Sequence, residues 1–118
     1  MKFLLICCHE EKVLAEMPKN DCDALMEETS VYCEALHKSG HLIVAEPLEP
    51  VEMAATVRVR SGKMSVTDGP FAETKEQIGG FFLINARDLN EAIQVASKFP
   101  SVRIGSMEVR PVKELHRQ

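Results

Sequence analysis

The chain starts with a run in which every position from residue 3 to residue 8 is apolar: Lys2-Phe3-Leu4-Leu5-Ile6-Cys7-Cys8. Successive side chains of a β-strand point to opposite faces of its sheet, so this run predicts a strand that is apolar on both faces. A strand with two apolar faces is typical of the middle of a sheet. We therefore expect the sheet to be built around residues 2–8.

The same run is too short for a targeting or membrane segment. A signal peptide needs about 7–15 apolar residues before a small-residue cleavage site, and a transmembrane helix needs about 18. Here the polar sequence His9-Glu10-Glu11 follows directly. The sequence therefore predicts a cytoplasmic protein with no membrane contact and with free cysteine thiols. We expect His9 to be a loop histidine in water, with a place at the rim of a pocket as the alternative.

Two segments have the apolar periodicity of amphipathic helices. They cover residues 20–39 and residues 88–99, and the second opens with the capping-box pair Asp88 and Glu91. The residues before the first helix, Pro18 among them, are expected to form a polar loop. The expected apolar faces consist of Cys22, Leu25, Thr29, Tyr32, Cys33 and Leu36 in the first helix, and of Leu89, Ala92, Ile93, Ala96 and Phe99 in the second.

The remaining pattern predicts strands and an inserted hairpin. Strands are expected over residues 41–46, 55–60, 64–67, 78–85 and 103–112, and Ser61-Gly62-Lys63 turns the hairpin. The order is β-α-β, the hairpin, then β-α-β. It predicts one α+β domain over residues 1–118 with a ferredoxin-like βαββαβ arrangement. Because both helices cover one face and the strands are apolar on both, we expect a homodimer of the dimeric α+β barrel type, in which two sheets pack together.

The charge balance excludes one class of partner. The chain has 14 basic and 18 acidic residues, hence a net charge of −4, and only six aromatic residues. Non-specific nucleic-acid binders need a basic surface, and single-strand binders need aromatic stacking platforms. We therefore expect no direct contact with nucleic acid.

The most polar segment is Asp68-Gly69-Pro70-Phe71-Ala72-Glu73-Thr74-Lys75-Glu76. Its plainest interpretation is a solvated turn. The functional interpretation is a polar pocket in which Asp68 is a base, Lys75 binds an anion, and Glu73 and Glu76 orient the ligand. Four polar residues of neighbouring strands are expected either to bind the ligand there or to pair between two copies of the chain: Arg58, Arg60, Glu108 and Arg110.

Neither a metal nor an organic cofactor is expected. Cys33, His37 and His41 follow one another at a spacing of four residues, which on one helix could place metal ligands on one face. Gly40 is expected to end that helix before His41, and this separates the three side chains.

Three segments together resemble the DGPF-motif proteins of the YCII-related family. They are residues 68–76, Gly79-Gly80-Phe81-Phe82-Leu83-Ile84, and Glu108-Val109-Arg110-Pro111-Val112. The resemblance extends over nearly the whole chain and implies a ferredoxin-like α+β fold, dimers and a bacterial cytoplasm. It also implies two kinds of role. Some relatives act on small aromatic or lactone-like compounds through a His-Asp acid/base pair, and others are encoded beside alternative sigma factors.

The sequence departs from the family at that histidine. The family places it on the first helix, where this chain has Thr29 beside Ser30. Neither hydroxyl replaces an imidazole as a base near neutral pH. Two functions stay open: a small-molecule-binding protein that is a cofactor-free acid/base enzyme, with Asp68 or Glu73 as the base and Lys75 as its partner, and a non-enzymatic regulatory partner of an alternative sigma factor. A third interpretation is structural, with Glu73 and Lys75 tying the hairpin to a dimer partner.

Overall fold

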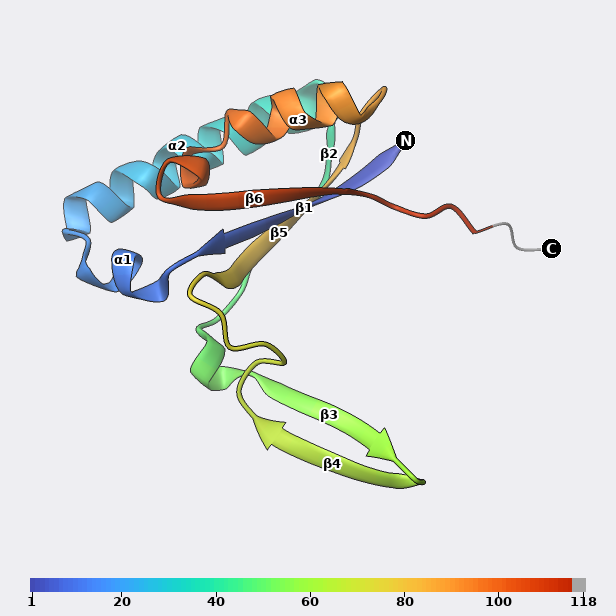
Figure 1. Ribbon diagram of the computed structural model, residues 1–118. Helices are drawn as coiled ribbons and strands as arrows, with labels where there is room; N and C mark the ends of the chain where they lie inside the picture. The colour runs from blue at the N-terminus through green and yellow to red at the C-terminus, as the bar shows by residue number, and fades with distance from the viewer. Residues whose placement is uncertain (116–118) are drawn as a thin grey trace.

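The computed structural model describes residues 1–115 and has mixed α+β structure (Figure 1). In chain order the elements are β1 (Lys2–His9), α1 (Glu11–Glu16), α2 (Lys19–Lys38), β2 (Leu42–Pro47), the short 3-10 helix η1 (Val51–Met53), β3 (Ala55–Arg60), β4 (Lys63–Asp68), β5 (Gln77–Asn85), α3 (Leu89–Ser97), η2 (Pro100–Arg103) and β6 (Gly105–Pro111).

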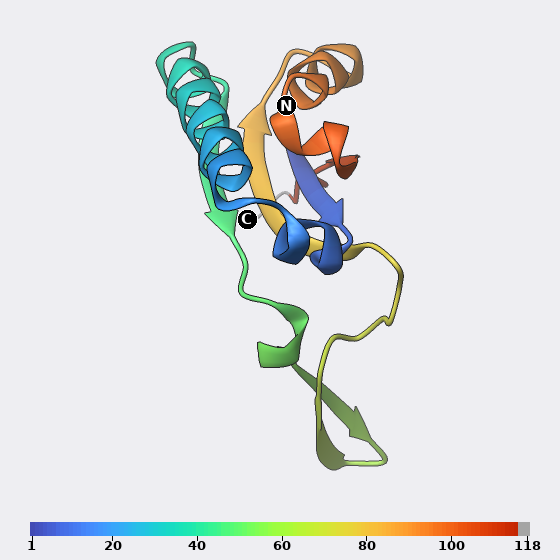
Figure 2. The ribbon, with the colours of Figure 1, turned by 90° about the vertical axis from the view of Figure 1, so that its left-hand side faces the viewer.

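The main sheet has four strands in the order β2-β5-β1-β6, and each neighbouring pair is antiparallel. The predicted central place of the first strand is confirmed, because β1 is hydrogen-bonded to β5 on one side and to β6 on the other. Both long helices, α2 and α3, lie on the same face of this sheet (Figures 1 and 2). Within residues 1–115, no helix is both long and apolar enough to cross a membrane.

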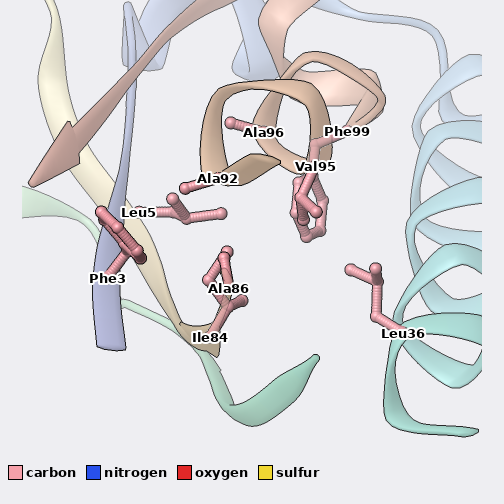
Figure 3. Packing of buried hydrophobic residues seen from close by; sticks show 9 residues of the cluster. All are labelled: Phe3, Leu5, Leu36, Ile84, Ala86, Ala92, Val95, Ala96 and Phe99. Carbon is pink, nitrogen blue, oxygen red and sulfur yellow. The ribbon is translucent and has the colours of Figure 1, made fainter. Parts of the chain in front are cut away.

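The core lies between that face of the sheet and the two helices. Phe3, Leu5 and Ile84 from the sheet are completely buried, and they face side chains of α3 and of α2 (Figure 3). Phe99 closes the core, since its ring stacks on Phe82 with 4.1 Å between the ring centroids. The full cluster of buried residues is Phe3, Leu5, Leu36, Ile84, Ala86, Ala92, Val95, Ala96 and Phe99.

The predicted apolar face of α2 is confirmed: its six members are the helix residues that are not exposed. The predicted face of α3 is partly wrong. Leu89 and Ile93 are 47% and 43% exposed, and Val95 is buried instead. Ala92, Val95, Ala96 and Phe99 keep the i, i+3, i+4, i+7 spacing, so the helix is rotated toward the smaller side chains, which allow it to lie close to the sheet.

The predicted polar loop after the first strand is also wrong, because residues 11–16 form the helix α1. Six residues are too few to show a helical period in the sequence, which needs a window of about 11 or more. Tertiary contacts fix this helix instead. Leu14 is half-buried, and the carboxylate of Glu11 accepts a hydrogen bond of 3.0 Å from the backbone N–H of Val51.

The hairpin of β3 and β4 forms a separate two-stranded sheet that projects away from the domain (Figures 1 and 2). Its turn has positive φ at Ser61 (52°) and Gly62 (75°), as the hairpin turn of type I′ requires. The register pairs Val57 with Val66 and Val59 with Met64 across the two strands. These four apolar side chains are 57–70% exposed.

The two long helices leave the other face of the main sheet open. Leu4 and Ile6 of β1 alternate with the core residues Phe3 and Leu5, so they point to this open face. On β5, Phe81 and Leu83 do the same, and all four are half-buried. The sheet is therefore apolar on both faces, as the sequence predicts.

Acid should weaken the anchoring of α3. The side chain of Asp88 accepts a hydrogen bond of 2.9 Å from the N–H of Glu91, and Glu91 accepts one of 3.0 Å from the N–H of Arg87. The N–H of Arg87, helped by its guanidinium and by His41, lowers the pKa of Glu91. A lowered carboxyl pKa stabilises the folded state above the ordinary pKa, and that stabilisation is lost as the pH falls through the folded value.

Replacing Glu91 with Gln should therefore remove part of the acid sensitivity. We expect the urea midpoint of the wild type to fall more than that of Glu91→Gln between about pH 6 and pH 3. Glu34→Gln, which removes a carboxylate from an exposed pair with Lys38, is the matched control and should behave as the wild type. Equal acid sensitivity in the wild type and Glu91→Gln would contradict the assignment.

Candidate functional site

A cavity of about 540 Å³ lies between α2 and the helix-covered face of the sheet; we call it the inner cavity. Its walls are mainly apolar and come from several elements, with Leu25 and Met26 on α2, Phe82 on β5 and Ile104 after η2. Met26 and Ser30 line it and are exposed to solvent, which places the mouth of the cavity beside α2.

The inner cavity exists because β1 and α2, which contribute large side chains to the core, carry smaller side chains where they line the cavity. On β1, Phe3 and Leu5 are buried in the core, whereas Cys7, on the same face, lines the cavity. On α2, Leu36 fills the core, whereas Cys33 and Thr29 line the cavity one and two turns earlier. Small side chains at facing positions leave space that a close-packed interior would fill.

His9, the last residue of β1, lines this cavity and is half-buried. Its ring lies against Gly79, where a Cβ atom would come within 2.1 Å of the ring atom Cε1. On the other side, Gly105 is its register partner on β6, and a Cβ atom there would come within 2.1 Å of the carbonyl oxygen of Cys8. Glycine on both neighbouring strands thus makes room for the end of β1 and for the imidazole.

An irregularity of the sheet creates the place for that ring. The pairing of β1 with β5 shifts by one residue between Cys7 and Cys8, so Gly79 is an extra residue on β5 without a partner on β1. Such a bulge bends its strand and redirects neighbouring side chains. Among residues 1–115 the imidazole of His9 has no hydrogen-bond partner, and both of its nitrogens remain accessible to solvent.

A second space of about 640 Å³, the outer cavity, adjoins the first between α1 and η1. The two cavities share four lining residues, His9, Leu14, Pro47 and Gly79, so the imidazole stands where they meet. The outer cavity is the more polar one, with Glu11, Lys12 and Glu52 in its wall.

The thiol and hydroxyl groups that line the inner cavity are less suited than an imidazole to exchange a proton near neutral pH. The carboxylate of Glu46 points to the open face of the sheet, because Glu46 is paired with Phe81. Burial raises the pKa of the Cys33 thiol, which keeps it protonated. The hydroxyl of Thr29 donates a hydrogen bond of 2.8 Å to the carbonyl of Leu25 and is thus occupied within its own helix. His9 is therefore the group of this cavity that is best suited to exchange a proton near neutral pH.

The structure places the predicted residues of the acidic segment away from both cavities. Lys75 pairs with Glu10 at 3.3 Å, and the carboxylate of Glu76 accepts a hydrogen bond of 2.7 Å from the hydroxyl of Ser106. Asp68 ends β4 at the base of the hairpin, and Glu73 is exposed.

The predicted strand residues are also separated from one another. The guanidinium of Arg58 lies over the ring of Phe71, 5.6 Å from its centroid, and that of Arg60 donates to the carbonyl of its neighbour Val59. Glu108 and Arg110 form an ion pair with each other on β6. Within residues 1–115, none of the eight predicted site residues lines either cavity: Asp68, Glu73, Lys75, Glu76, Arg58, Arg60, Glu108 and Arg110.

Comparison with known proteins identifies the family. Residues 1–116 match the YCII-related domain. The chain belongs to the YCII-related family. It is also 36% identical over 114 residues to an uncharacterized protein of Rhizobium meliloti (strain 1021), an alignment that covers 95% of this chain and 92% of the relative. The YCII-related domain thus includes both cavities and the acidic segment.

In this YCII-related chain, the sequence-based interpretation of His9 as a loop histidine in water is wrong, and its alternative, a place at a pocket rim, is confirmed. Alternation could have indicated this, because Phe3, Leu5, Cys7 and His9 share one face of a strand. Thr29 lines the same cavity as His9. The bulge at Gly79 carries no sequence signal beyond the glycine pair itself.

The half-buried thiol of Cys33 gives a direct chemical test of this site. Because alkylation requires the thiolate, a raised pKa should shift the pH profile of Cys33 labelling by iodoacetamide to higher pH than the ordinary thiol value of about 8.5. Mass spectrometry of the Cys33 peptide measures this profile, and the urea-unfolded chain serves as the reference. Identical profiles in the folded and unfolded chain would show that the thiol is not buried.

Proposed function

We propose that the protein binds a small, largely apolar molecule in the inner cavity. The observation that carries this proposal is the cavity itself: about 540 Å³ of space between α2 and the sheet, with mainly apolar walls and one imidazole at the end. Ligand sites are typically concave and mostly apolar, about 300–1,000 Å³ in size, with a few polar groups that orient the ligand.

The residues that line the inner cavity indicate the chemical character of the ligand. Leu25, Phe82 and Ile104 offer apolar surface, and burying apolar ligand area against them is favourable by about 25 cal/mol per Å². A polar contact is available from His9, at the end of β1. These features favour a molecule with an apolar body and a polar group at one end.

The arrangement of the domain supports the same proposal. The strand order β2-β5-β1-β6, with α2 and α3 as crossovers on one face, is the order that a ferredoxin-like split βαβ unit produces. We infer from it the ferredoxin-like arrangement with an inserted hairpin. In such a unit the space between the first crossover helix and the sheet lies beside the end of the central strand, as the inner cavity does.

We further infer that the protein works as a homodimer. The open face of the sheet carries Leu4, Ile6, Phe81 and Leu83, and the hairpin exposes a second apolar surface. An isolated two-stranded hairpin is marginally stable in water, so the hairpin needs a surface to pack against. A second copy of the chain supplies both an apolar sheet and an apolar hairpin, which makes the contact self-complementary.

Filling the inner cavity should weaken ligand binding. Ser30 lines the mouth and is exposed, so Ser30→Trp should place an indole in the cavity without disturbing the core. The probe is 4-nitrophenol, a small molecule with an apolar ring and a polar hydroxyl group at one end. We expect Ser30→Trp to weaken its binding, measured by calorimetry, by about tenfold or more, which is about 1.4 kcal/mol. The matched control is Val31→Trp, whose side chain is 58% exposed and does not line the cavity.

The same measurement separates the inner cavity from the acidic segment. The double variant Asp68→Asn, Lys75→Met tests the pocket proposed around those residues. If it binds 4-nitrophenol as the wild type does and Ser30→Trp does not, the inner cavity holds the ligand. The opposite result would move the site to the acidic segment. The absence of saturable binding by the folded wild type would refute the proposal.

The homodimer can be tested by placing an arginine on either of the two faces of β4. Val66 lies on the apolar face of the hairpin and Ser65 on the opposite face, and both are exposed in the single chain. We expect a dimer by light scattering for the wild type and for Ser65→Arg, and a monomer for Val66→Arg, because a charge would have to be buried without a partner. A wild-type monomer at micromolar concentration would contradict the dimer.

The alternative function, a non-enzymatic regulatory partner of an alternative sigma factor, stays a prediction from the family resemblance. None of the contacts among residues 1–115 points to such a partner specifically. Retention of a sigma factor by the wild type in a pull-down would favour it.

A further inference from the structure

We propose that His9 is the proton-exchanging group of the inner cavity and that the ligand presents to it a weakly acidic O–H group, such as that of a phenol or an enol. This inference rests on the proposed function, since it requires that the inner cavity binds the ligand. It goes further by naming the residue that meets the reactive group and the chemical class of that group.

The first support is the way in which His9 is held. A Cβ atom at Gly79 would lie 2.1 Å from Cε1, 2.7 Å from Nδ1 and 3.3 Å from Nε2 of the imidazole. The Cε1–Nδ1 edge of the ring therefore rests on the backbone of β5, and Nε2 is the nitrogen farther from that strand. Gly105 leaves room on the β6 side, where a Cβ atom would come within 3.0 Å of the His9 Cβ atom. The ring is positioned by close approach of backbone, without a hydrogen bond.

The second support is a contrast between two histidines of the same chain. The ring of His41 is held at both nitrogens, by the hydroxyl of Ser39 at 2.7 Å and by the carboxylate of Glu91 at 3.3 Å. Such a histidine has a structural role, because its nitrogens are occupied. His9 has neither kind of partner among residues 1–115, both of its nitrogens keep access to solvent, and the residue lines both cavities.

The charges around His9 define the class of the ligand. Besides His9, the ionisable residues that line the two cavities are Cys7, Cys33 and Glu46 in the inner one, and Glu11, Lys12 and Glu52 in the outer one. Glu46 is paired with Phe81, so its side chain points to the open face of the sheet and not into the inner cavity. No lysine or arginine within the described residues lines the inner cavity. A permanently charged carboxylate would lose its hydration there without a cation to pair with. A neutral O–H group enters without that cost and ionises only by transfer to the imidazole.

The proton step is balanced and needs no further reactant. A neutral nitrogen of His9 accepts the proton, the O–H bond of the ligand breaks, and its electron pair stays on the oxygen. The products are an imidazolium and an oxyanion side by side in a cavity with mainly apolar walls, where their attraction is stronger than in water. His9 thus supplies the cation that the inner cavity lacks, and the reverse transfer returns the proton.

The probe for this step is 4-nitrophenol, because its phenolate and its neutral phenol have different absorption spectra. The spectrum of the bound probe is recorded at a pH at which the free probe is mostly the neutral phenol. We expect the wild type to show the phenolate band of the bound probe. In His9→Gln the ratio of phenolate to phenol should fall about tenfold, which corresponds to about one pKa unit of the bound probe. His37→Gln, which removes an exposed imidazole that lines neither cavity, should match the wild type.

Each result decides between the two proposals. Saturable binding with equal phenolate bands in the wild type and His9→Gln would overturn the role of His9 and leave the binding function standing. The absence of saturable binding by the wild type would overturn both. A further test is Gly79→Ala, which must displace the ring. If the variant keeps the circular dichroism spectrum of the wild type, it should bind the probe with a reduced phenolate band, and an unchanged band in the folded variant would overturn the positioning by Gly79.

Discussion

The structure depends on β1 having hydrogen-bonded neighbours on both sides. Its pairing with β5 runs from Lys2 to His9, and its pairing with β6 runs from Phe3 to His9. α2 connects β1 to β2 across β5, and α3 connects β5 to β6 across β1 in the opposite direction. Because crossovers between parallel strands are right-handed as a rule and β1 and β5 are antiparallel, both helices lie over the same face of the sheet (Figure 1). Core and inner cavity are therefore parts of one layer. The open face results from the same constraint, since the alternate side chains of β1 have no helix to cover them.

Along that layer, side-chain size separates the region that stabilises the fold from the region that is free to bind. Near Phe3 the space is filled, and the stacked rings of Phe82 and Phe99 complete the packing. Phe82 also lines the inner cavity, so its ring lies at the boundary between the core and the cavity. Atoms that face an empty space lose the dispersion contacts that a packed core provides. A bound apolar molecule would restore such contacts.

Alternation and helical period predicted most of the fold. The central place of β1, the buried face of α2 and the hairpin turn at Ser61 and Gly62 follow from patterns that span many residues. Alternation assigns His9 to the core face of β1, but the cavity beside it could not be predicted in the same way. Whether the imidazole of His9 faces water or a cavity depends on α1, a six-residue helix without a recognisable period. It depends as well on the bulge at Gly79, which only the pairing of two distant segments reveals.

The acidic segment concentrates charged residues, and its contacts lie at the base of the hairpin. The N–H of Gly69 donates to the carbonyl of Ala54 at 2.7 Å, and the hydroxyl of Thr56 donates to the carbonyl of Gly69 at 2.9 Å. At its other end Lys75 pairs with Glu10, next to the end of β1. The first two contacts close the base of the hairpin, and the third links the acidic segment to the residue that follows β1. A concentration of charged residues in a sequence therefore indicates where polar side chains gather. A half-buried imidazole without a hydrogen-bond partner among residues 1–115, as in His9, indicates where a polar side chain is available to a ligand.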